Sequence, residues 1–158
     1  MKFNICILPP RIETVVFSID GSFAANVSLS GTDPKIRAGA VDIVRYWQDL
    51  GYLILYCTAR PDIQQATVTN WLEQHNFPKG LMFFGDGIST VPFRQKSETL
   101  QRIVQDNQLI VKAGYGAPRD ISMYKKLNLS RENIFIIRKS SKKKYAEKAN
   151  VSISVEYR

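Results

Sequence analysis

The chain has 158 residues and is 44% hydrophobic, which fits one globular domain with a core that needs neither disulfides nor metal. Its opening stretch "MKFNICILPP" is too short and too broken by proline for a secretory signal or a bilayer span. The formal net charge is +8, and from Arg119 onward the chain has eleven Lys or Arg and four Asp or Glu. This basic end is either a solvated surface or a surface that binds the phosphates of lipid or nucleic acid.

Strand-like and helix-like segments alternate along the chain. In order, the pattern predicts a strand at 13–18, a helix at 38–51, a strand at 52–58, a helix at 61–76, a strand at 80–84, a helix at 96–107, a strand at 109–115, a helix at 118–127, a strand at 133–137, a helix at 141–150 and a final strand at 151–157. Apolar strands that alternate with helices predict an α/β fold, in which a parallel sheet is covered by helices on both faces.

Two of these helices have a clear apolar pattern. The helix at 38–51 repeats apolar residues at three-residue steps: Val41, Val44, Trp47 and Leu50. The helix at 61–76 places its apolar residues on or near one face: Ile63, Val68, Trp71 and Leu72. Cys57 lies in the apolar run "YLILYC", which predicts a buried, reduced thiol.

Polar residues follow the predicted strands, and in such sheets ligands bind at the carboxyl ends of the strands. The first strand leads into Ser18, Asp20, Gly21 and Ser22, and the second into Thr58 and Ala59 before a predicted helix. Helix amides and a lysine, Lys96, favour an anion, and Gly21 allows its backbone to approach an oxyanion closely. Together these features predict a phosphate site.

The order Asp20-Gly21-Ser22, Thr58, Lys96, Asp120 resembles the four motifs of haloacid-dehalogenase-type phosphatases. The segments "FSIDGSF", "ARPD", "WLEQHNFPKG" and "YGAPRDISMY" are still more similar to the Lipin/Ned/Smp domain at the C-terminus of the Nir, or retinal-degeneration-B, membrane-associated phosphatidylinositol-transfer proteins. The resemblance covers residues 13–137 and fades after Arg138. It implies a haloacid-dehalogenase-like, Rossmann-like fold for one domain (1–158) from the C-terminal part of a longer protein, with a basic end at 139–158.

One position departs from the catalytic pattern. Active lipins are magnesium-dependent phosphatidate phosphatases in which the first aspartate of Asp-x-Asp-Gly-Thr attacks phosphorus, and here Ser18 stands at that position. A serine hydroxyl is a poor nucleophile unless a base activates it, and no third residue is evident to orient Asp20 as that base. The pattern favours a pocket that holds a phosphomonoester. The alternative is a phosphatidate phosphatase or phosphotransferase that uses Ser18, or water activated by Asp20 with magnesium.

The resemblance implies that this domain recognises phosphatidic acid and targets a lipid-transfer protein to membranes. The implied headgroup-binding residues are Ser18, Asp20, Gly21, Ser22, Thr58, Ala59 and Lys96. Asp20 and Asp120 are the implied ligands of a weakly bound Mg²⁺, although the fourth motif, residues 116–120, is shorter than in lipins. The implied location is cytoplasmic and peripheral, at the plasma membrane or at endoplasmic reticulum–plasma membrane contacts, alongside other domains of the parent protein.

Membrane docking is expected from the basic end, through Lys139, Lys142, Lys143 and Lys144. Three or four lysines at about 1 kcal/mol each would raise affinity for an anionic surface roughly a hundredfold to a thousandfold. Phe23 and the segment 24–34 are further candidates for bilayer contact, although a plain surface loop is the favoured interpretation of this stretch. Nucleic-acid binding is the rival hypothesis, but Tyr145 is the only aromatic residue interleaved with the lysines at 139–148, so no nucleic-acid partner is expected.

Overall fold

The computed structural model describes residues 6–23 and 36–137. Within them one five-stranded sheet has the order β3-β2-β1-β4-β5, and every pair of neighbouring strands is parallel. The strands are β1 (Glu13–Ser18), β2 (Leu53–Pro61), β3 (Leu81–Gly85), β4 (Ile110–Gly116) and β5 (Ile134–Ile136). The predicted parallel sheet is therefore confirmed.

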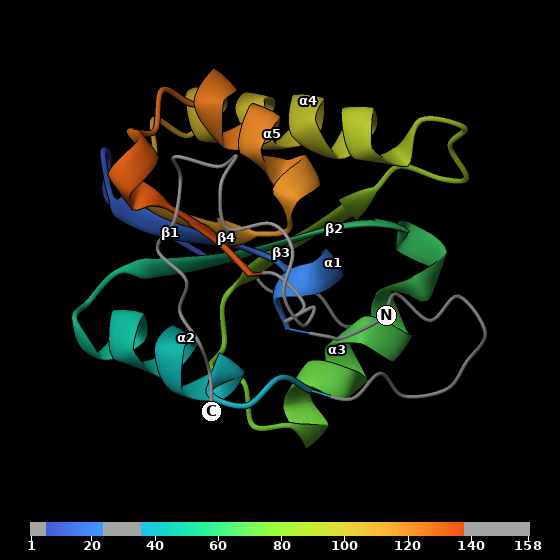
Figure 1. The fold of residues 1–158 in the computed structure, drawn as a ribbon, viewed down its shortest axis with the longest axis horizontal. Helices are drawn as coiled ribbons and strands as arrows, with labels where there is room; N and C mark the ends of the chain where they lie inside the picture. The colour runs from blue at the N-terminus through green and yellow to red at the C-terminus, as the bar shows by residue number, and fades with distance from the viewer. Residues whose placement is uncertain (1–5, 24–35, 138–158) are drawn as a thin grey trace, which may run out of the picture.

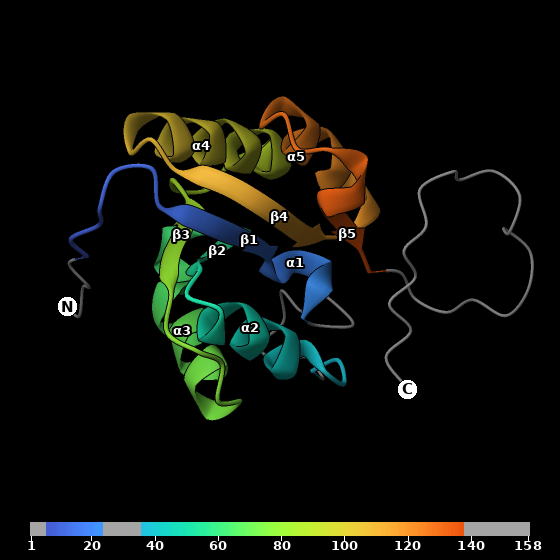
Figure 2. The same ribbon diagram turned by 90° about the vertical axis from the view of Figure 1, so that its left-hand side faces the viewer.

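Helices cover both faces of this sheet, as predicted. They are α1 (Ile19–Ser22), α2 (Ala40–Asp49), α3 (Gln65–Gln74), α4 (Pro92–Asp106) and α5 (Ile121–Lys126), with short 3₁₀ turns η1 (Asp62–Gln64), η2 (Pro118–Asp120) and η3 (Arg131–Asn133). Figure 1 and Figure 2 show α4 and α5 on one face and α2 and α3 on the other. The helix predicted at 141–150 and the strand predicted at 151–157 lie outside the described residues.

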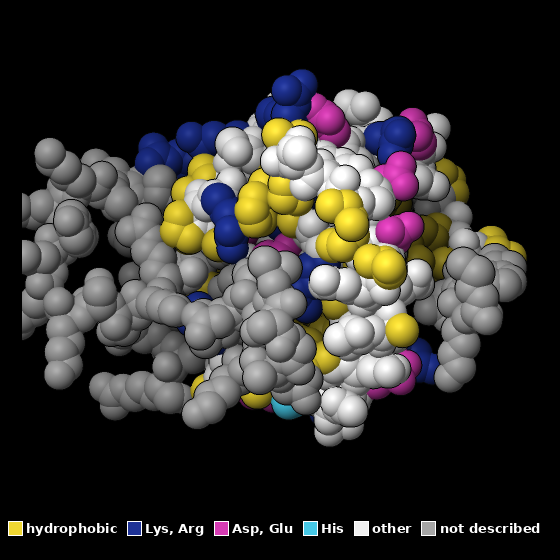
Figure 3. Space-filling model, turned by 90° about the vertical axis from the view of Figure 1, so that its right-hand side faces the viewer, with side chains coloured by type: hydrophobic (Ala, Val, Ile, Leu, Met, Phe, Trp, Pro, Cys, Tyr) yellow, Lys and Arg dark blue, Asp and Glu magenta, His cyan; other side chains and the backbone are white. Residues whose placement is uncertain are grey.

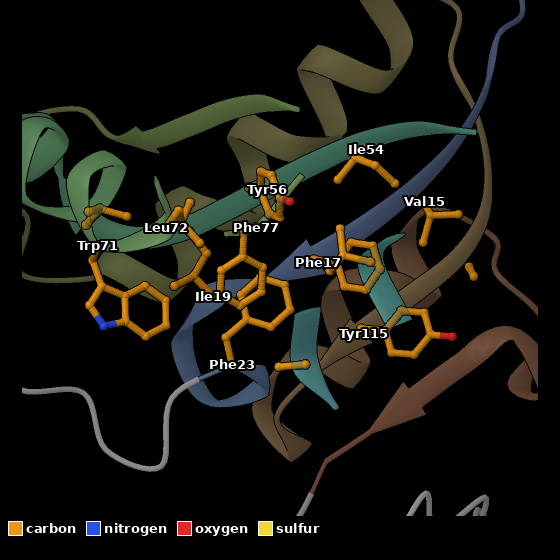
Figure 4. Close-up of a cluster of buried hydrophobic side chains, with 14 residues drawn as sticks. Val15, Phe17, Ile19, Phe23, Ile54, Tyr56, Trp71, Leu72, Phe77 and Tyr115 are labelled. Atoms are coloured by element: carbon orange, nitrogen blue, oxygen red, sulfur yellow. The ribbon is translucent and has the colours of Figure 1, made fainter. Parts of the chain in front are cut away.

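The alternation of side chains along β1 divides the core in two. Val15 and Phe17 join the cluster under α2 and α3, where Figure 4 shows them among aromatic rings. Val16 joins the second cluster, which includes Leu100 of α4. Because side chains alternate with a period of two, Ser18 follows Val16 toward the α4 face at the end of the strand. Each buried large apolar side chain contributes about 1.5–3 kcal/mol.

Three residues do not lie where the sequence pattern placed them. Phe23, a candidate for bilayer contact, is only 1% exposed, and its ring centroid lies 4.6 Å from that of Phe77 in the core (Figure 4). Ile63 is 82% exposed because β2 continues to Pro61, so Ile63 falls in η1 and not on the buried face of α3. Leu50 is 54% exposed because it caps α2 after the last helical turn.

The strand order makes the carboxyl end of β1 a topological switch point. The chain runs from β1 to β2 on one side, whereas β4 pairs with the opposite side of β1. Ligands in open α/β sheets bind outside the carboxyl ends of the strands at such a point. Helix α4 begins at Pro92, four residues earlier than predicted, which places Lys96 inside the helix near its N-terminal end.

Candidate functional site

Five polar side chains are buried together at this switch point. They come from β1, α1, β2, α4 and η2, and each is at most 3% exposed: Ser18, Asp20, Thr58, Lys96 and Asp120. Buried polar and charged groups are tolerated when they pair with one another. The structure thus brings together the side chains that the sequence motifs singled out at separate strand ends.

Lys96 is the centre of the cluster. Its Nζ donates hydrogen bonds to Ser18 Oγ at 2.6 Å and to Asp120 Oδ1 at 2.8 Å. The same nitrogen lies 3.7 Å from Asp20 Oδ2. Burial acts to lower the pKa of Lys96, but the carboxylates of Asp120 and Asp20, together with the hydrogen bond to Asp120, outweigh burial and hold that pKa above its ordinary value. Lys96 therefore carries a positive charge at neutral pH.

Asp20 is held by the end of β2. Thr58 Oγ1 donates to Asp20 Oδ1 at 3.0 Å, and the Ala59 amide donates to Asp20 Oδ2 at 2.6 Å. The sequence placed Thr58 just before a helix, but it lies within β2, and its hydroxyl accepts a hydrogen bond from the Arg60 amide. The hydroxyl and amide predicted to face a ligand thus hold the carboxylate of Asp20 in this structure.

Asp120 is fixed by a tight turn after β4. The Ala117 amide donates to Asp120 Oδ2 at 2.8 Å. A side chain at Gly116 would place its Cβ 2.7 Å from that same oxygen, which is a steric clash. Gly116 is therefore needed so that Asp120 can turn back under Lys96.

The chain turns helical directly after β1. Residues Ile19–Ser22 form the single helical turn α1, which contains both Asp20 and Gly21. Ser22 is buried, and its hydroxyl donates to the carbonyl of Ser18. Ser22 thus braces the turn through the hydroxyl that was predicted to bind a headgroup.

Arg60 is a member of the site that the sequence motifs did not single out. Its side chain is only 10% exposed, and its Nε lies 4.0 Å from Asp20 Oδ1. This Nε is buried and has no hydrogen-bond partner among the described residues. Its position in "ARPD", two residues after Thr58, is the signal that could have found it. Together Lys96 and Arg60 balance the charges of Asp20 and Asp120.

The two carboxylates fit Mg²⁺ poorly in this arrangement. All four of their oxygens accept hydrogen bonds from protein groups. No group of three or more His, Cys, Asp or Glu in the described part of the chain could hold a metal ion. Magnesium prefers several oxygen ligands, so it would have to displace Lys96 from Asp120. The weak Mg²⁺ binding expected from the sequence stays a prediction.

Two other predictions concern parts of the chain outside the described residues. Lys139, Lys142, Lys143 and Lys144 are among these residues, as is the segment 24–34. Across 6–23 and 36–137, no helix has the length and hydropathy to cross a bilayer.

Cys57 is buried as predicted, and burial raises the pKa of its thiol to about 12, so it stays neutral beside Lys96.

Solved structures support the fold at low sequence identity. A structure of the Pnkp1/Rnl/Hen1 RNA repair complex contains a chain with a TM-score of 0.68 and 12% identity, covering 87% of this chain and 47% of that one. The class C acid phosphatase from Bacillus anthracis, solved with tungstate bound, gives a TM-score of 0.58 and 12% identity, covering 81% and 67%. At this identity the likeness shows the haloacid-dehalogenase-like fold alone.

Sequence relatives are much closer. Membrane-associated phosphatidylinositol transfer protein 3 of Mus musculus is 55% identical over 137 residues, which span 87% of this chain and 14% of the relative. Protein retinal degeneration B of Drosophila melanogaster is 52% identical over 137 residues, 87% of this chain and 11% of that protein. The chain therefore corresponds to a small part of these proteins. Residues 15–138 match the family described as PITM 1-3, LNS2 domain. The chain thus belongs to the LNS2 domain family of these phosphatidylinositol transfer proteins, as its motifs predicted.

Proposed function

We propose that this domain binds the phosphomonoester headgroup of phosphatidic acid without hydrolysing it, and so targets its parent protein to membranes. The observation that carries the proposal is the 2.6 Å contact between Lys96 Nζ and the hydroxyl of Ser18. A neutral hydroxyl occupies the position where active lipins have a carboxylate. The charge of Lys96 is therefore shared between two carboxylates, those of Asp120 and Asp20.

The charge balance of the site suits an incoming phosphate. Lys96 and Arg60 offset Asp20 and Asp120, so the cluster is close to neutral, whereas an aspartate at position 18 would make it negative. A phosphomonoester is recognised by its high negative charge, and arginine can bind it through two parallel hydrogen bonds. Lys96 is 1% exposed, so a phosphate reaches it only when neighbouring side chains shift. Opening of the pocket is part of this proposal.

Chemistry at Ser18 is disfavoured by the same contact. Nucleophilic attack by serine needs a base that accepts the hydroxyl proton. The group that contacts Ser18 Oγ is Lys96 Nζ, whose raised pKa keeps it a hydrogen-bond donor at neutral pH. Both oxygens of Asp20 accept hydrogen bonds from Thr58 and Ala59, and among the described residues no hydrogen bond joins Asp20 to the Ser18 hydroxyl. We propose that any Mg²⁺ at Asp20 and Asp120 binds weakly and is dispensable for headgroup binding.

The wider setting follows from the relatives and is likewise proposed. They are named membrane-associated phosphatidylinositol transfer proteins. We propose that the domain acts on the cytoplasmic side of the plasma membrane or at its contacts with the endoplasmic reticulum, together with the other domains of a lipid-transfer protein. The lysines of the basic end would add attraction to the anionic surface.

Calorimetric titration with a soluble short-chain phosphatidic acid, in EDTA, tests the pocket without a bilayer. Binding is expected for the unchanged domain and should weaken about tenfold or more in Arg60→Gln, through loss of charge-assisted hydrogen bonds. Lys112→Gln is the matched control, because Lys112 is a half-exposed cation paired with Glu13 at the start of β1. Equal loss in both variants, or release of phosphate from the lipid by the unchanged domain, would refute the proposal.

A further inference from the structure

The edge of the sheet that carries the buried polar cluster also carries a set of exposed apolar side chains. Among the described residues, four large apolar side chains on the segments that follow β2 and β3 are exposed by 82%, 95%, 54% and 42%: Ile63, Ile88, Val91 and Phe93. We call these four residues the apolar rim. Single exposed apolar residues are ordinary, but several at one edge mark a surface that contacts something apolar.

The backbone holds the segments of the apolar rim beside one another. Pro61 pairs with Gly85 in the sheet, so η1 and the loop 86–91 start from adjacent positions. Gln95 Nε2 donates to the carbonyl of Asp86 at 2.9 Å, which ties that loop to the first turns of α4. The apolar rim is therefore a surface built by ordered segments of the fold.

One contact joins the apolar rim to the pocket. Arg119 Cζ lies 4.2 Å from the centre of the Phe93 ring, a cation–π contact. Phe93 and Lys96 are three residues apart on α4, and Arg119 and Asp120 are neighbours in η2. The exposed contact between Phe93 and Arg119 thus joins the same two elements as the buried ion pair between Lys96 and Asp120. A ligand bound at the buried cluster and a surface in contact with the apolar rim would therefore lie at the same edge of the sheet.

We propose that the apolar rim inserts into the interfacial layer of an anionic bilayer whose phosphatidic acid occupies the pocket, an inference that rests on the proposed function. Figure 3 shows apolar side chains among charged ones on the face at the carboxyl ends of the strands. Amphipathic surfaces of this kind seat apolar groups below the headgroups, with cations at phosphate level. Arg119, exposed and stacked on Phe93, is complementary in charge to lipid phosphates at that depth.

Charged residues beside the apolar rim favour a bilayer over a protein partner. Asp62, Asp86 and Arg94 are exposed on the same segments, and Arg119 is exposed on the neighbouring turn η2, so apolar residues and charges of both signs lie together there. The core of a stable protein interface is depleted of charged residues. Because these charges nearly cancel, insertion by the apolar rim is expected to persist at high salt, unlike attraction by the lysines at 139–144.

The test compares vesicles with free lipid. The double variant Ile63→Ser with Ile88→Ser removes the two most exposed members of the apolar rim, and Leu50→Ser removes a 54% exposed apolar residue at the end of α2 as the control. Binding to phosphatidic acid/phosphatidylcholine vesicles at high salt is measured by co-sedimentation, and binding of short-chain phosphatidic acid by calorimetry. We expect vesicle affinity to fall about tenfold or more in the double variant, with unchanged affinity for the short-chain lipid.

Each outcome decides between the claims. A double variant that binds vesicles like the Leu50→Ser control overturns insertion of the apolar rim, while the headgroup pocket stands if short-chain lipid still binds. Failure of the unchanged domain to bind short-chain lipid overturns the pocket. A second reporter is an environment-sensitive fluorophore on Ile88→Cys in a Cys6→Ser background, with Leu50→Cys as control, since Cys6 is exposed and Cys57 buried. A blue shift on vesicles at position 88 alone supports insertion, and equal shifts or no shift at both positions refute it.

Discussion

Lys96 donates a 2.6 Å hydrogen bond to Ser18, a residue 78 positions earlier in the chain. This contact joins α4 to the end of β1 across the α4 face of the sheet. It also affects the charge of the buried cluster, because a hydroxyl accepts the lysine hydrogen bond without adding a negative charge. The properties of the site therefore depend strongly on which side chain stands at position 18.

Replacing Ser18 with aspartate should change the charge of the pocket while keeping its hydrogen bond to Lys96. Ser18→Asp adds a negative charge beside Asp20 and Asp120, so affinity for phosphatidic acid measured in EDTA is expected to fall about tenfold or more. Ser18→Asn, which has the same shape without the charge, is the control and should retain more of the affinity. Equal affinities of the two variants would contradict the charge argument.

Gly116 should be needed for the position of Asp120. A Cβ there would lie 2.7 Å from Asp120 Oδ2, so Gly116→Ala is expected to displace the carboxylate, cost about 1–3 kcal/mol of stability and weaken headgroup binding. The control is Gly85→Ala, because its Cβ would meet no atom closer than 3.4 Å. Urea unfolding followed by circular dichroism measures the stability difference, and similar losses in the two variants would show that Asp120 tolerates the displacement.

Cys57 should make the fold sensitive to alkaline pH. Burial raises the pKa of its thiol from 9.0 to about 12. Because the folded-state pKa lies above that of the unfolded chain, this contribution to stability is fully present below about pH 9 and is lost as the pH rises toward 12. The free energy of unfolding should fall by up to about 1.4 kcal/mol per pH unit in this window.

The Cys57→Ala variant isolates this effect. It is less stable at every pH because it leaves a cavity, but it should have a shallower slope between pH 9 and pH 10 than the unchanged chain. Tyr124, which is also buried with a raised pKa, titrates from a higher ordinary value of 10.0 and contributes mainly above this range. Parallel slopes for the variant and the unchanged chain would show that Cys57 does not control the alkaline transition.

Much of the fold could be predicted because its signals are local. Apolar runs mark each strand, and the amphipathic helices between them require parallel pairing. The ends of elements were harder to predict, since they depend on tertiary contacts. Strand β2 continues through Pro61 because Pro61 still pairs with Gly85 of β3. Thr58 therefore lies within the strand, whereas the sequence predicts that it lies just before a helix.

The residues of the buried cluster could be predicted more fully than their contacts. The order of the motifs identified Ser18, Asp20, Lys96 and Asp120, but the spacing of these residues in the sequence does not show which hydrogen bonds each of them makes. Arg60 could not be predicted as a member of the site because an arginine after a strand is common, and only the structure shows that it is buried beside Asp20. The prediction that Phe23 contacts a bilayer was wrong because Phe23 follows the helical turn α1 and its ring packs on Phe77 in the core.

The most direct test of the central claim is headgroup selectivity on vesicles. Phosphatidic acid and phosphatidylserine vesicles matched for zeta potential would be compared by co-sedimentation for the unchanged domain, Lys96→Met and the control Lys112→Met, with circular dichroism to confirm folding. The account predicts a clear preference for phosphatidic acid that Lys96→Met abolishes and Lys112→Met retains. Binding that follows only surface charge, in all three proteins alike, would contradict it.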